Sequence, residues 1–105
     1  MEEVFLKLEK IIEMRQADNP ENSYVAELCE KGDDFILKKI GEESAELIIA
    51  SKNKSKNDIL NECADVLFHK IVLLKYNSLS IFDVIKVLEE RLGKSGIEEK
   101  ETRLK

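Results

Sequence analysis

Residues 58–75 read DILNECADVLFHKIVLLK, and this stretch decides the fold. At about 100° per residue around a helix, its apolar side chains fill one broad sector: Ile59, Leu60, Cys63, Val66, Leu67, Ile71, Leu73 and Leu74. Its polar side chains line up on another sector: Asp58, Glu62, Asp65 and His69. A helix that is apolar over most of its surface belongs in an interior. The stretch therefore predicts a buried central helix with a narrow acidic seam.

The composition is that of one compact helical domain. The chain has 105 residues, of which 43% are hydrophobic and only 6% aromatic, with one proline and four glycines. Enough apolar residues are present to build a core, and the shortage of aromatic residues disfavours a strand-rich fold. We therefore expect a single domain over residues 1–105 with an all-α architecture, an antiparallel bundle of four to five helices.

Charge and cysteine content limit the partners and the compartment. Charged residues make up 37% of the chain and the formal net charge is -5, with Lys and Arg scattered along it. We expect neither nucleic acid nor membrane as a partner, because such a surface repels both, and an anionic ligand would need cations to mediate its binding. Cys29 and Cys63 lack the spacing of a metal finger and the density of a secreted scaffold, which indicates reduced thiols. Since there is no membrane span and no signal peptide, we expect a cytoplasmic protein.

Apolar spacing predicts two helices in the N-terminal third of the chain. The first covers about residues 2–16 and ends before the turn around Pro20, which cannot continue a helix. Ser23 is expected to cap a short second helix over about residues 24–30. Gly32 is expected to end that helix.

A third helix should pair with the central one. Asp33 or Asp34 is expected to cap it, and it should run to about Lys52. Its predicted inner face consists of Ile36, Leu37, Ile40, Leu47 and Ile48. Residues 53–57 form a short polar loop, so the third and central helices should lie antiparallel as a hairpin.

A capping motif predicts where the last helix begins. Ser80 and Asp83 stand three apart ahead of an apolar run, which is a variant of the capping box. The helix should run to about Leu92 and be closed by Gly93. Its predicted inner face consists of Ile81, Val84, Ile85 and Leu88. Residues 94–105 contain few apolar side chains, so this arm is either solvated or ordered by a partner or ligand.

Carboxylate pairs recur at helical spacing on the third and the central helix. Glu43 and Glu46 are three residues apart, as are Glu62 and Asp65, so each pair shares a helix face. Packed antiparallel, the two helices would bring these carboxylates into one small volume, where like charges raise one another's pKa. A hard divalent cation would resolve the repulsion, which predicts Mg²⁺, with Mn²⁺ as the alternative. Glu42 is the weaker ligand candidate, because it points nearly opposite to the apolar sector.

A plainer interpretation exists for each of these residues. Glutamate pairs at this spacing are common on solvated helix faces. The position of Glu62 and Asp65 within the most apolar helix favours a site, because unpaired acids are rarely tolerated there. His69 is interpreted first as a hydrogen-bonded structural residue, since a hard cation prefers oxygen ligands. Asp58 likewise has a secondary role.

Several segments resemble known enzymes. The acidic spacing, Glu42-Glu43-x-x-Glu46 followed by Glu62-x-x-Asp65, resembles the signature of the MazG-like, all-α nucleoside triphosphate pyrophosphohydrolase superfamily. Longer segments resemble the phosphoribosyl-ATP pyrophosphohydrolase family of histidine biosynthesis: SYVAEL at 23–28, ILKKIGEE at 36–43, the 62–69 segment with its Ala64, Leu67 and His69, and RLGKSGIEEK at 91–100. The resemblance covers about residues 3–103, and the C-terminal Ser-Gly-x-Glu-Glu-Lys makes the narrower assignment.

The resemblance implies a reaction and an assembly. The chain would hydrolyse 1-(5-phosphoribosyl)-ATP to 1-(5-phosphoribosyl)-AMP and pyrophosphate, the second step of histidine biosynthesis, as a stand-alone homodimeric enzyme. A dimer agrees with a central helix too apolar for a small monomer to cover. The four carboxylates would hold Mg²⁺ and serve catalysis: Glu43, Glu46, Glu62 and Asp65. Whether a carboxylate or the ion activates the attacking water is left open.

Basic and polar residues are candidate substrate contacts. Lys39 lies one turn before Glu43 and projects on the same side, so it is the first candidate to bind phosphate, with Lys38 second. The resemblance adds possible phosphate or ribose contacts: Arg91, Ser95, Lys100 and Arg103. Ordinary surface exposure would equally explain those four residues.

Two other functions stay open from the sequence. A house-cleaning pyrophosphohydrolase acting on another nucleotide would share the acidic motif but would not need the C-terminal arm. A non-catalytic helical dimerisation module would use the acids for solubility or assembly. Inward-facing Glu62 and Asp65 argue against that module, because apolar residues would serve an interface better.

Overall fold

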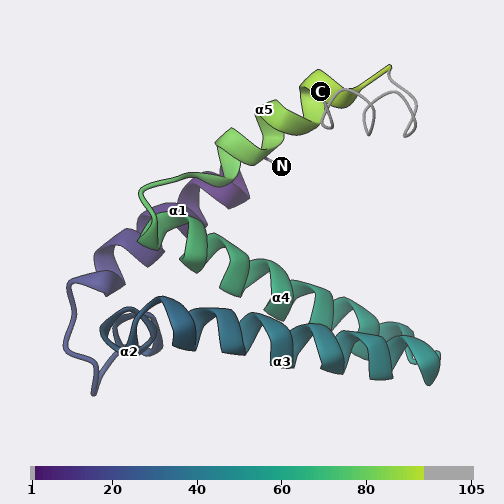
Figure 1. Ribbon diagram of the computed structural model, residues 1–105, viewed down its shortest axis with the longest axis horizontal. Helices are drawn as coiled ribbons and strands as arrows, with labels where there is room; N and C mark the ends of the chain where they lie inside the picture. The colour runs from purple at the N-terminus through teal and green to yellow at the C-terminus, as the bar shows by residue number, and fades with distance from the viewer. Residues whose placement is uncertain (1, 94–105) are drawn as a thin grey trace.

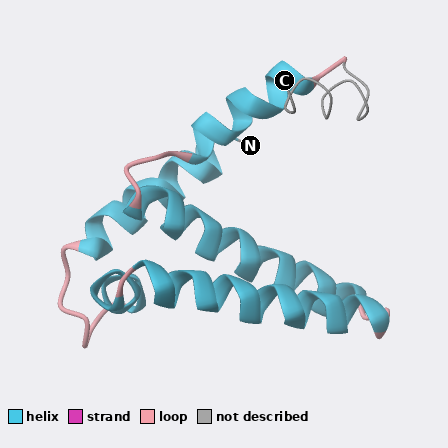
Figure 2. Cartoon of the chain, viewed as in Figure 1, coloured by secondary structure: helices cyan, strands magenta, loops and turns pink. Residues whose placement is uncertain are grey.

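The computed structural model describes residues 2–93, which form five α-helices and no strand (Figures 1 and 2). The helices are α1 (Glu2–Gln16), α2 (Tyr24–Lys31), α3 (Asp33–Lys52), α4 (Lys56–Tyr76) and α5 (Ile81–Arg91). This confirms the predicted all-α class. None of these helices is long and apolar enough to cross a membrane. The predicted arm at 94–105, with Ser95, Lys100 and Arg103, lies outside the described residues.

A long hairpin of α3 and α4 dominates the molecule (Figure 1). The two helices run antiparallel, joined by residues 53–55, with Lys54 in the left-handed region at φ 61°. The Ser55 hydroxyl caps α4 by accepting a hydrogen bond of 3.4 Å from the amide of Asp58. Helices α1 and α2 lie at the end of the hairpin where α3 begins and α4 ends, and α5 diverges from it (Figure 1).

The core lies at that end of the hairpin, where four helices meet. Its fully buried side chains come from α1, α2, α3 and α4: Ile12, Val25, Leu28, Ile36, Ile71 and Val72. Burying one such side chain stabilises the fold by about 1.5–3 kcal/mol. The C-terminal half of α4 supplies two of them, so this half is the buried part of the central helix.

The prediction of a buried central helix is confirmed for the C-terminal half of α4 and is wrong for other parts of α4 in a single chain. Leu60 is 69% exposed and Leu67 38% exposed, although both belong to the apolar sector. The other apolar side chains that were expected inside but lie exposed are Leu37, Ile48, Cys63, Val84 and Leu88. The reason is geometric, because only α3 accompanies the N-terminal half of α4, and α5 diverges from the hairpin (Figure 1).

The helix ends follow the sequence signals with one exception. The Ser23 hydroxyl accepts a hydrogen bond of 3.1 Å from the amide of Ala26, which confirms the cap of α2. Gly32, at φ 92°, ends α2 as expected. The prediction that Asp33 or Asp34 caps α3 is wrong. The N-cap residue of α3 is Gly32, which has no side chain to accept a hydrogen bond from the first turn. Gly32 is the single residue between the two helices, so both aspartates lie in the first turn of α3, where negative charge is favourable.

A buried glutamate fastens α5 to α1. The predicted capping box of Ser80 and Asp83 is confirmed. In addition, the carboxylate of Glu9, which is only 6% exposed, accepts hydrogen bonds from the Ser80 hydroxyl at 2.9 and 3.0 Å and from the Ile81 amide at 2.8 Å. One side chain of α1 thus satisfies two donors at the beginning of α5, the Ser80 hydroxyl and the Ile81 amide.

Removing this carboxylate should destabilise the fold. Glu9→Ala leaves the Ile81 amide without its acceptor in a buried place, which costs about 2 kcal/mol. Urea denaturation should show a lower free energy of unfolding than for Glu3→Ala, which removes an exposed carboxylate from the same helix. An equal loss of unfolding free energy in the two variants would mean that the hydrogen bonds of Glu9 to α5 do not stabilise the fold.

Candidate functional site

Three carboxylates from facing helices converge in the hairpin. Glu43 comes from α3, and Glu62 and Asp65 come from α4; one carboxylate oxygen of each lies within 4.8 Å of the other two. The antiparallel pairing sets the middle of α3 against the first half of α4, and the three-residue spacing puts the two α4 acids on one face. The structure thus brings together three of the four predicted carboxylates.

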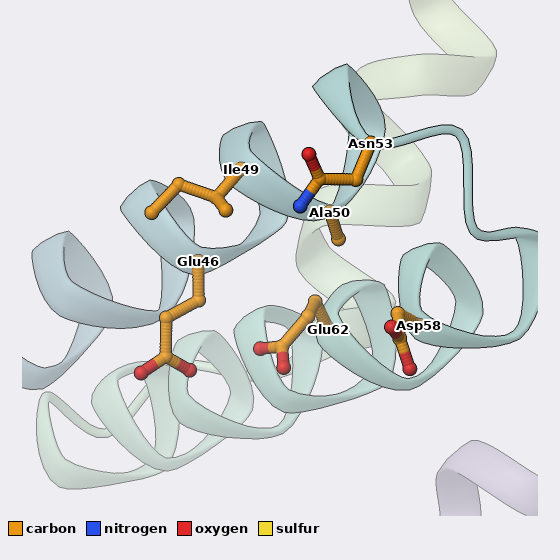
Figure 3. Close-up of a pocket in the computed structure, with 6 residues that line it drawn as sticks. All are labelled: Glu46, Ile49, Ala50, Asn53, Asp58 and Glu62. Atoms are coloured by element: carbon orange, nitrogen blue, oxygen red, sulfur yellow. The ribbon is translucent and has the colours of Figure 1, made fainter.

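Glu46, the fourth predicted carboxylate, lies beside this group and is exposed. Figure 3 shows it reaching from α3 toward α4, near Glu62. The negative charge of Glu46 contributes to raising the pKa of Glu43 and the pKa of Glu62. Its role as a ligand stays a prediction. Glu42 is exposed on another side of α3 and is not part of the group, as its facing indicated.

The electrostatics of the cluster disfavour its fully ionised state. Burial is the first cause that raises the pKa of the Glu62 carboxyl, and Glu46, Asp65 and Glu43 add to the shift. Burial also leads the rise in the pKa of Glu43, followed by Glu46 and Asp65. Glu43 and Glu62 therefore resist losing their protons while the neighbouring carboxylates are charged. A divalent cation would offset this repulsion.

One carboxylate oxygen of Glu62 indicates a cation site more specifically than the pKa shifts do. Its Oε2 atom is shielded from solvent and has no hydrogen-bond partner among the described residues. A buried carboxylate oxygen without a donor is costly and needs an explanation. A cation bound between Glu62 and its neighbours would satisfy it. Oxygen-only donors at this spacing fit a hard ion such as Mg²⁺.

A pocket of about 220 Å³ adjoins the cluster (Figure 3). It is lined by Glu46, Ile49, Ala50, Asn53, Asp58 and Glu62. Asp58, which shares the acidic seam of α4, belongs to the pocket wall and not to the converging group. A second hollow of about 210 Å³, lined by Ile11, Met14, Arg15 and Asp18, shares no residue with the cluster. Of these two hollows, the pocket beside the acids is the one that adjoins the carboxylate group.

Lys39 stands at the edge of the cluster. Its ammonium nitrogen lies 3.4 Å from Oε2 of Glu42 and 3.8 Å from Oε1 of Glu43. Lys38 is exposed. Arg91 lies in the last turn of α5, which diverges from the hairpin (Figure 1). Of the predicted basic contacts that the structure describes, only Lys39 adjoins the acids.

His69 and Tyr24 form a contact that the sequence did not reveal. His69 is 5% exposed; its Nδ1 lies 2.7 Å from the backbone oxygen of Asp65 and its Nε2 lies 2.8 Å from the Tyr24 hydroxyl. These bonds support the structural interpretation of His69. Tyr24 was expected only as the first residue of a helix, because no local pattern signals a partner far along the chain.

Comparison with known proteins supplies the family. A family model described as phosphoribosyl-ATP pyrophosphohydrolase matches residues 5–92. Similar proteins named phosphoribosyl-ATP pyrophosphatase include that of Vesicomyosocius okutanii, 45% identical over 98% of both chains, and that of Hydrogenovibrio crunogenus, 43% identical over 98% of this chain and 95% of the relative. That of Janthinobacterium sp. is 48% identical over 98% of this chain and 97% of the relative. The resemblance found in the sequence is thereby confirmed, and the chain belongs to the phosphoribosyl-ATP pyrophosphohydrolase family.

Proposed function

We propose that this chain hydrolyses 1-(5-phosphoribosyl)-ATP to 1-(5-phosphoribosyl)-AMP and pyrophosphate, the second step of histidine biosynthesis, in the cytoplasm. The observation that carries the proposal is the convergence of Glu43, Glu62 and Asp65 within the segment matched by the family. Relatives of nearly the same length bear the name of this activity. A non-catalytic module would have no use for repelling acids in a half-buried place.

Glu43, Glu62 and Asp65 would hold Mg²⁺, with Glu46 as a further ligand beside them. The orphaned oxygen of Glu62 and the oxygen-only donor set support this assignment. When bound, such an ion neutralises charge on phosphate oxygens and polarises the phosphoryl group for attack.

The protein's own residues would bind and orient the substrate. Lys39 would contact the polyphosphate from the edge of the cluster, and the adjoining pocket would receive another part of the nucleotide. Water attacks, the phosphoanhydride bond between the α and β phosphates breaks, and pyrophosphate leaves. The proton of the water would pass to a carboxylate of the cluster. Further substrate contacts that we propose are Lys38, Arg91, Ser95, Lys100 and Arg103.

A homodimer would complete the fold. The hairpin leaves large apolar side chains exposed on both helices: Leu37, Ile48, Ile49, Leu60 and Leu67. Exposed apolar side chains in this number favour association, so light scattering should give twice the monomer mass of 12.1 kDa. Leu60→Glu should weaken the dimer, whereas Asn57→Glu adds the same charge at an exposed polar position of α4 and should not. A monomeric wild-type protein at micromolar concentration would contradict the dimer.

The substrate can be tested directly. With Mg²⁺, the purified protein should release pyrophosphate from phosphoribosyl-ATP and much less from ATP or dCTP. Release from ATP or dCTP but not from phosphoribosyl-ATP would favour a house-cleaning enzyme. No release from any of the three would favour the non-catalytic alternative.

A further inference from the structure

The pocket of about 220 Å³ extends from the acidic cluster toward the loop that joins α3 to α4 (Figure 3). Glu62 lines it on the side of the cluster and carries the shielded oxygen that has no hydrogen-bond partner among the described residues. Asn53 and Asp58 line the end nearest the loop. Pockets that bury a whole drug-sized ligand hold about 300–1,000 Å³, so this one fits a single part of a nucleotide.

The position of Asp58 matches the length of a nucleoside. Asp58 precedes Glu62 by four residues on α4, which corresponds to a rise of about 6 Å along the helix. The ribose of a nucleotide puts a comparable distance between the α-phosphate and the base. With the polyphosphate at an ion held by Glu62, the base would therefore reach the end of the pocket that Asn53 and Asp58 line.

The pocket wall combines apolar and acidic groups. Ile49 and Ala50 provide an apolar surface, while three of the six lining residues are acids and none is basic. Such a wall repels a phosphate group that has no cation to mediate its binding. A purine ring has apolar faces and a polar edge, so it suits the wall better than the polyphosphate or the second phosphoribosyl group does.

The side chains of Asp58 and Asn53 are available to a ligand. Within residues 2–93, neither the Asp58 carboxylate nor the Asn53 side-chain amide has a hydrogen-bond or ion-pair partner, and both residues are exposed. Asp58 lies in the first turn of α4, where negative charge is favourable. The loop end of the pocket thus presents one anionic group and one amide that no other part of the described chain engages.

The base of phosphoribosyl-ATP differs from that of ATP in its charge. Its adenine carries the phosphoribosyl group on N1, so N1, C6 and N6 form an amidine, which is a much stronger base than adenine. At neutral pH this unit is an amidinium, whose positive charge is shared by N1 and N6. The adenine of ATP is neutral at the same pH. A carboxylate that faces this edge therefore attracts one base much more than the other.

We propose that the pocket binds the N1-substituted adenine of the substrate, and that the carboxylate of Asp58 selects this cationic base over the neutral adenine of ATP. Asn53 contributes to binding either base, because an asparagine amide can pair with N6 and N7 of adenine. The inference rests on the proposed function, which supplies the N1-substituted nucleotide. It makes Asp58 and Asn53 substrate-binding residues and assigns neither of them a chemical step.

The alternative is that Asp58 only stabilises the N-terminal end of α4. Asp34 is the matched control, because it is another exposed aspartate in the first turn of a long helix, and it does not line the pocket. Asp58→Asn and Asp34→Asn remove the same charge from equivalent helix positions. Both variants should therefore lower the melting temperature to a similar small extent, and only Asp58→Asn should change the choice of base.

Calorimetry in the presence of Mg²⁺ tests this choice with three nucleoside monophosphates. AMP has a neutral base, 1-methyl-AMP has the cationic N1-substituted base, and 1-methyl-IMP has the same methyl group on a neutral base. The wild-type protein should bind 1-methyl-AMP about tenfold more tightly than the other two, the effect of one charge-assisted hydrogen bond. Asp58→Asn should lose this preference, whereas Asp34→Asn should keep it.

Several results of this titration would overturn the inference. They are equal affinities of the wild-type protein for the three ligands, binding of none of them, and an undiminished preference for 1-methyl-AMP in Asp58→Asn. Asn53→Ala should weaken AMP and 1-methyl-AMP alike by about fivefold, the effect of one neutral hydrogen bond, and retain the preference. Unchanged affinities in Asn53→Ala would remove Asn53 from the pocket's binding groups.

Turnover provides the second readout and separates the inference from the proposed function. Asp58→Asn should raise KM for phosphoribosyl-ATP by about tenfold and leave kcat within about twofold, because the contact to the base is the same before and during the reaction. A wild-type protein that does not hydrolyse phosphoribosyl-ATP would contradict the proposed function, and the three monophosphates would still judge the pocket. A wild-type protein that hydrolyses phosphoribosyl-ATP but does not distinguish the three ligands would overturn the inference alone.

Discussion

Glu62→Gln is expected to lower the rate of phosphoribosyl-ATP hydrolysis by at least about 100-fold, because even the outer partners of metal ligands are worth about 10- to 100-fold. Glu62 carries the buried oxygen that lacks a hydrogen-bond partner among the described residues, and it belongs to the converging group of acids. An amide keeps the shape of the side chain but loses the charge that binds a cation. Steady-state release of pyrophosphate measures the loss.

The same substitution should leave the metal-free fold at least as stable as the wild type. The raised pKa of Glu62 means that its ionised form is disfavoured in the folded chain, so this acid destabilises the fold at neutral pH and ceases to do so as the pH falls through its raised pKa. Replacing it with a neutral amide removes that repulsion. Thermal denaturation in EDTA should therefore show an equal or higher melting temperature. A variant with full activity would remove the metal assignment, and an unfolded variant would contradict the repulsion argument.

Glu43→Gln is expected to reduce activity far more than Glu42→Gln, although the two residues are adjacent. The side chain of Glu43 is 14% exposed and belongs to the converging group, whereas that of Glu42 is 47% exposed and contacts Lys39 at 3.4 Å. Loss of a ligand should again cost about 100-fold, and loss of one exposed ion pair about fivefold at most. Kinetics of the two variants at saturating Mg²⁺ provide the comparison.

Glu42→Gln is the matched control for Glu43→Gln, since both variants remove one negative charge from the same turn of α3. Similar losses in the two variants would mean that net charge matters more than ligation. A larger loss in Glu42→Gln would show that α3 presents a different face to the substrate than the structure indicates.

Features encoded by neighbouring residues could be predicted from the sequence. The bounds of α1, the cap of α2 by Ser23 and the capping box of α5 all depend on side chains within one turn of the backbone they serve. The facing of Glu42 and Glu43 follows from helical geometry in the same way. These predictions succeeded because the physical cause lies within a few residues along the chain.

Features that depend on contacts between residues far apart in the chain could not be predicted from the sequence. Glu9 meets Ser80 across 71 residues and Tyr24 meets His69 across 45, and neither pair has a local signature. The exposure of Leu60 was mispredicted for a related reason. Periodicity indicates which face of α4 is apolar, but it does not indicate whether another helix of the same chain reaches that face.

The candidate site was predictable in its main part. Spacing placed Glu62 and Asp65 on one face, and the hairpin loop implied that α3 would face them. That Glu46 lies outside the tight group was not foreseen, because helical spacing indicates a shared face but not the distances between carboxylate oxygens on two helices. The structure therefore distinguishes a tight group of three acids from a looser neighbour.

The central claim is that the acids between α3 and α4 form a cation site, and titration of Mg²⁺ into the metal-free protein tests it most directly. Isothermal calorimetry of the wild-type protein should show saturable binding of Mg²⁺, which weakens as the pH falls because protons compete for Glu43 and Glu62, whose pKa values are raised. Glu62→Gln should abolish that binding, while Glu42→Gln should retain it. Binding of Mg²⁺ by Glu62→Gln with wild-type affinity would contradict the account.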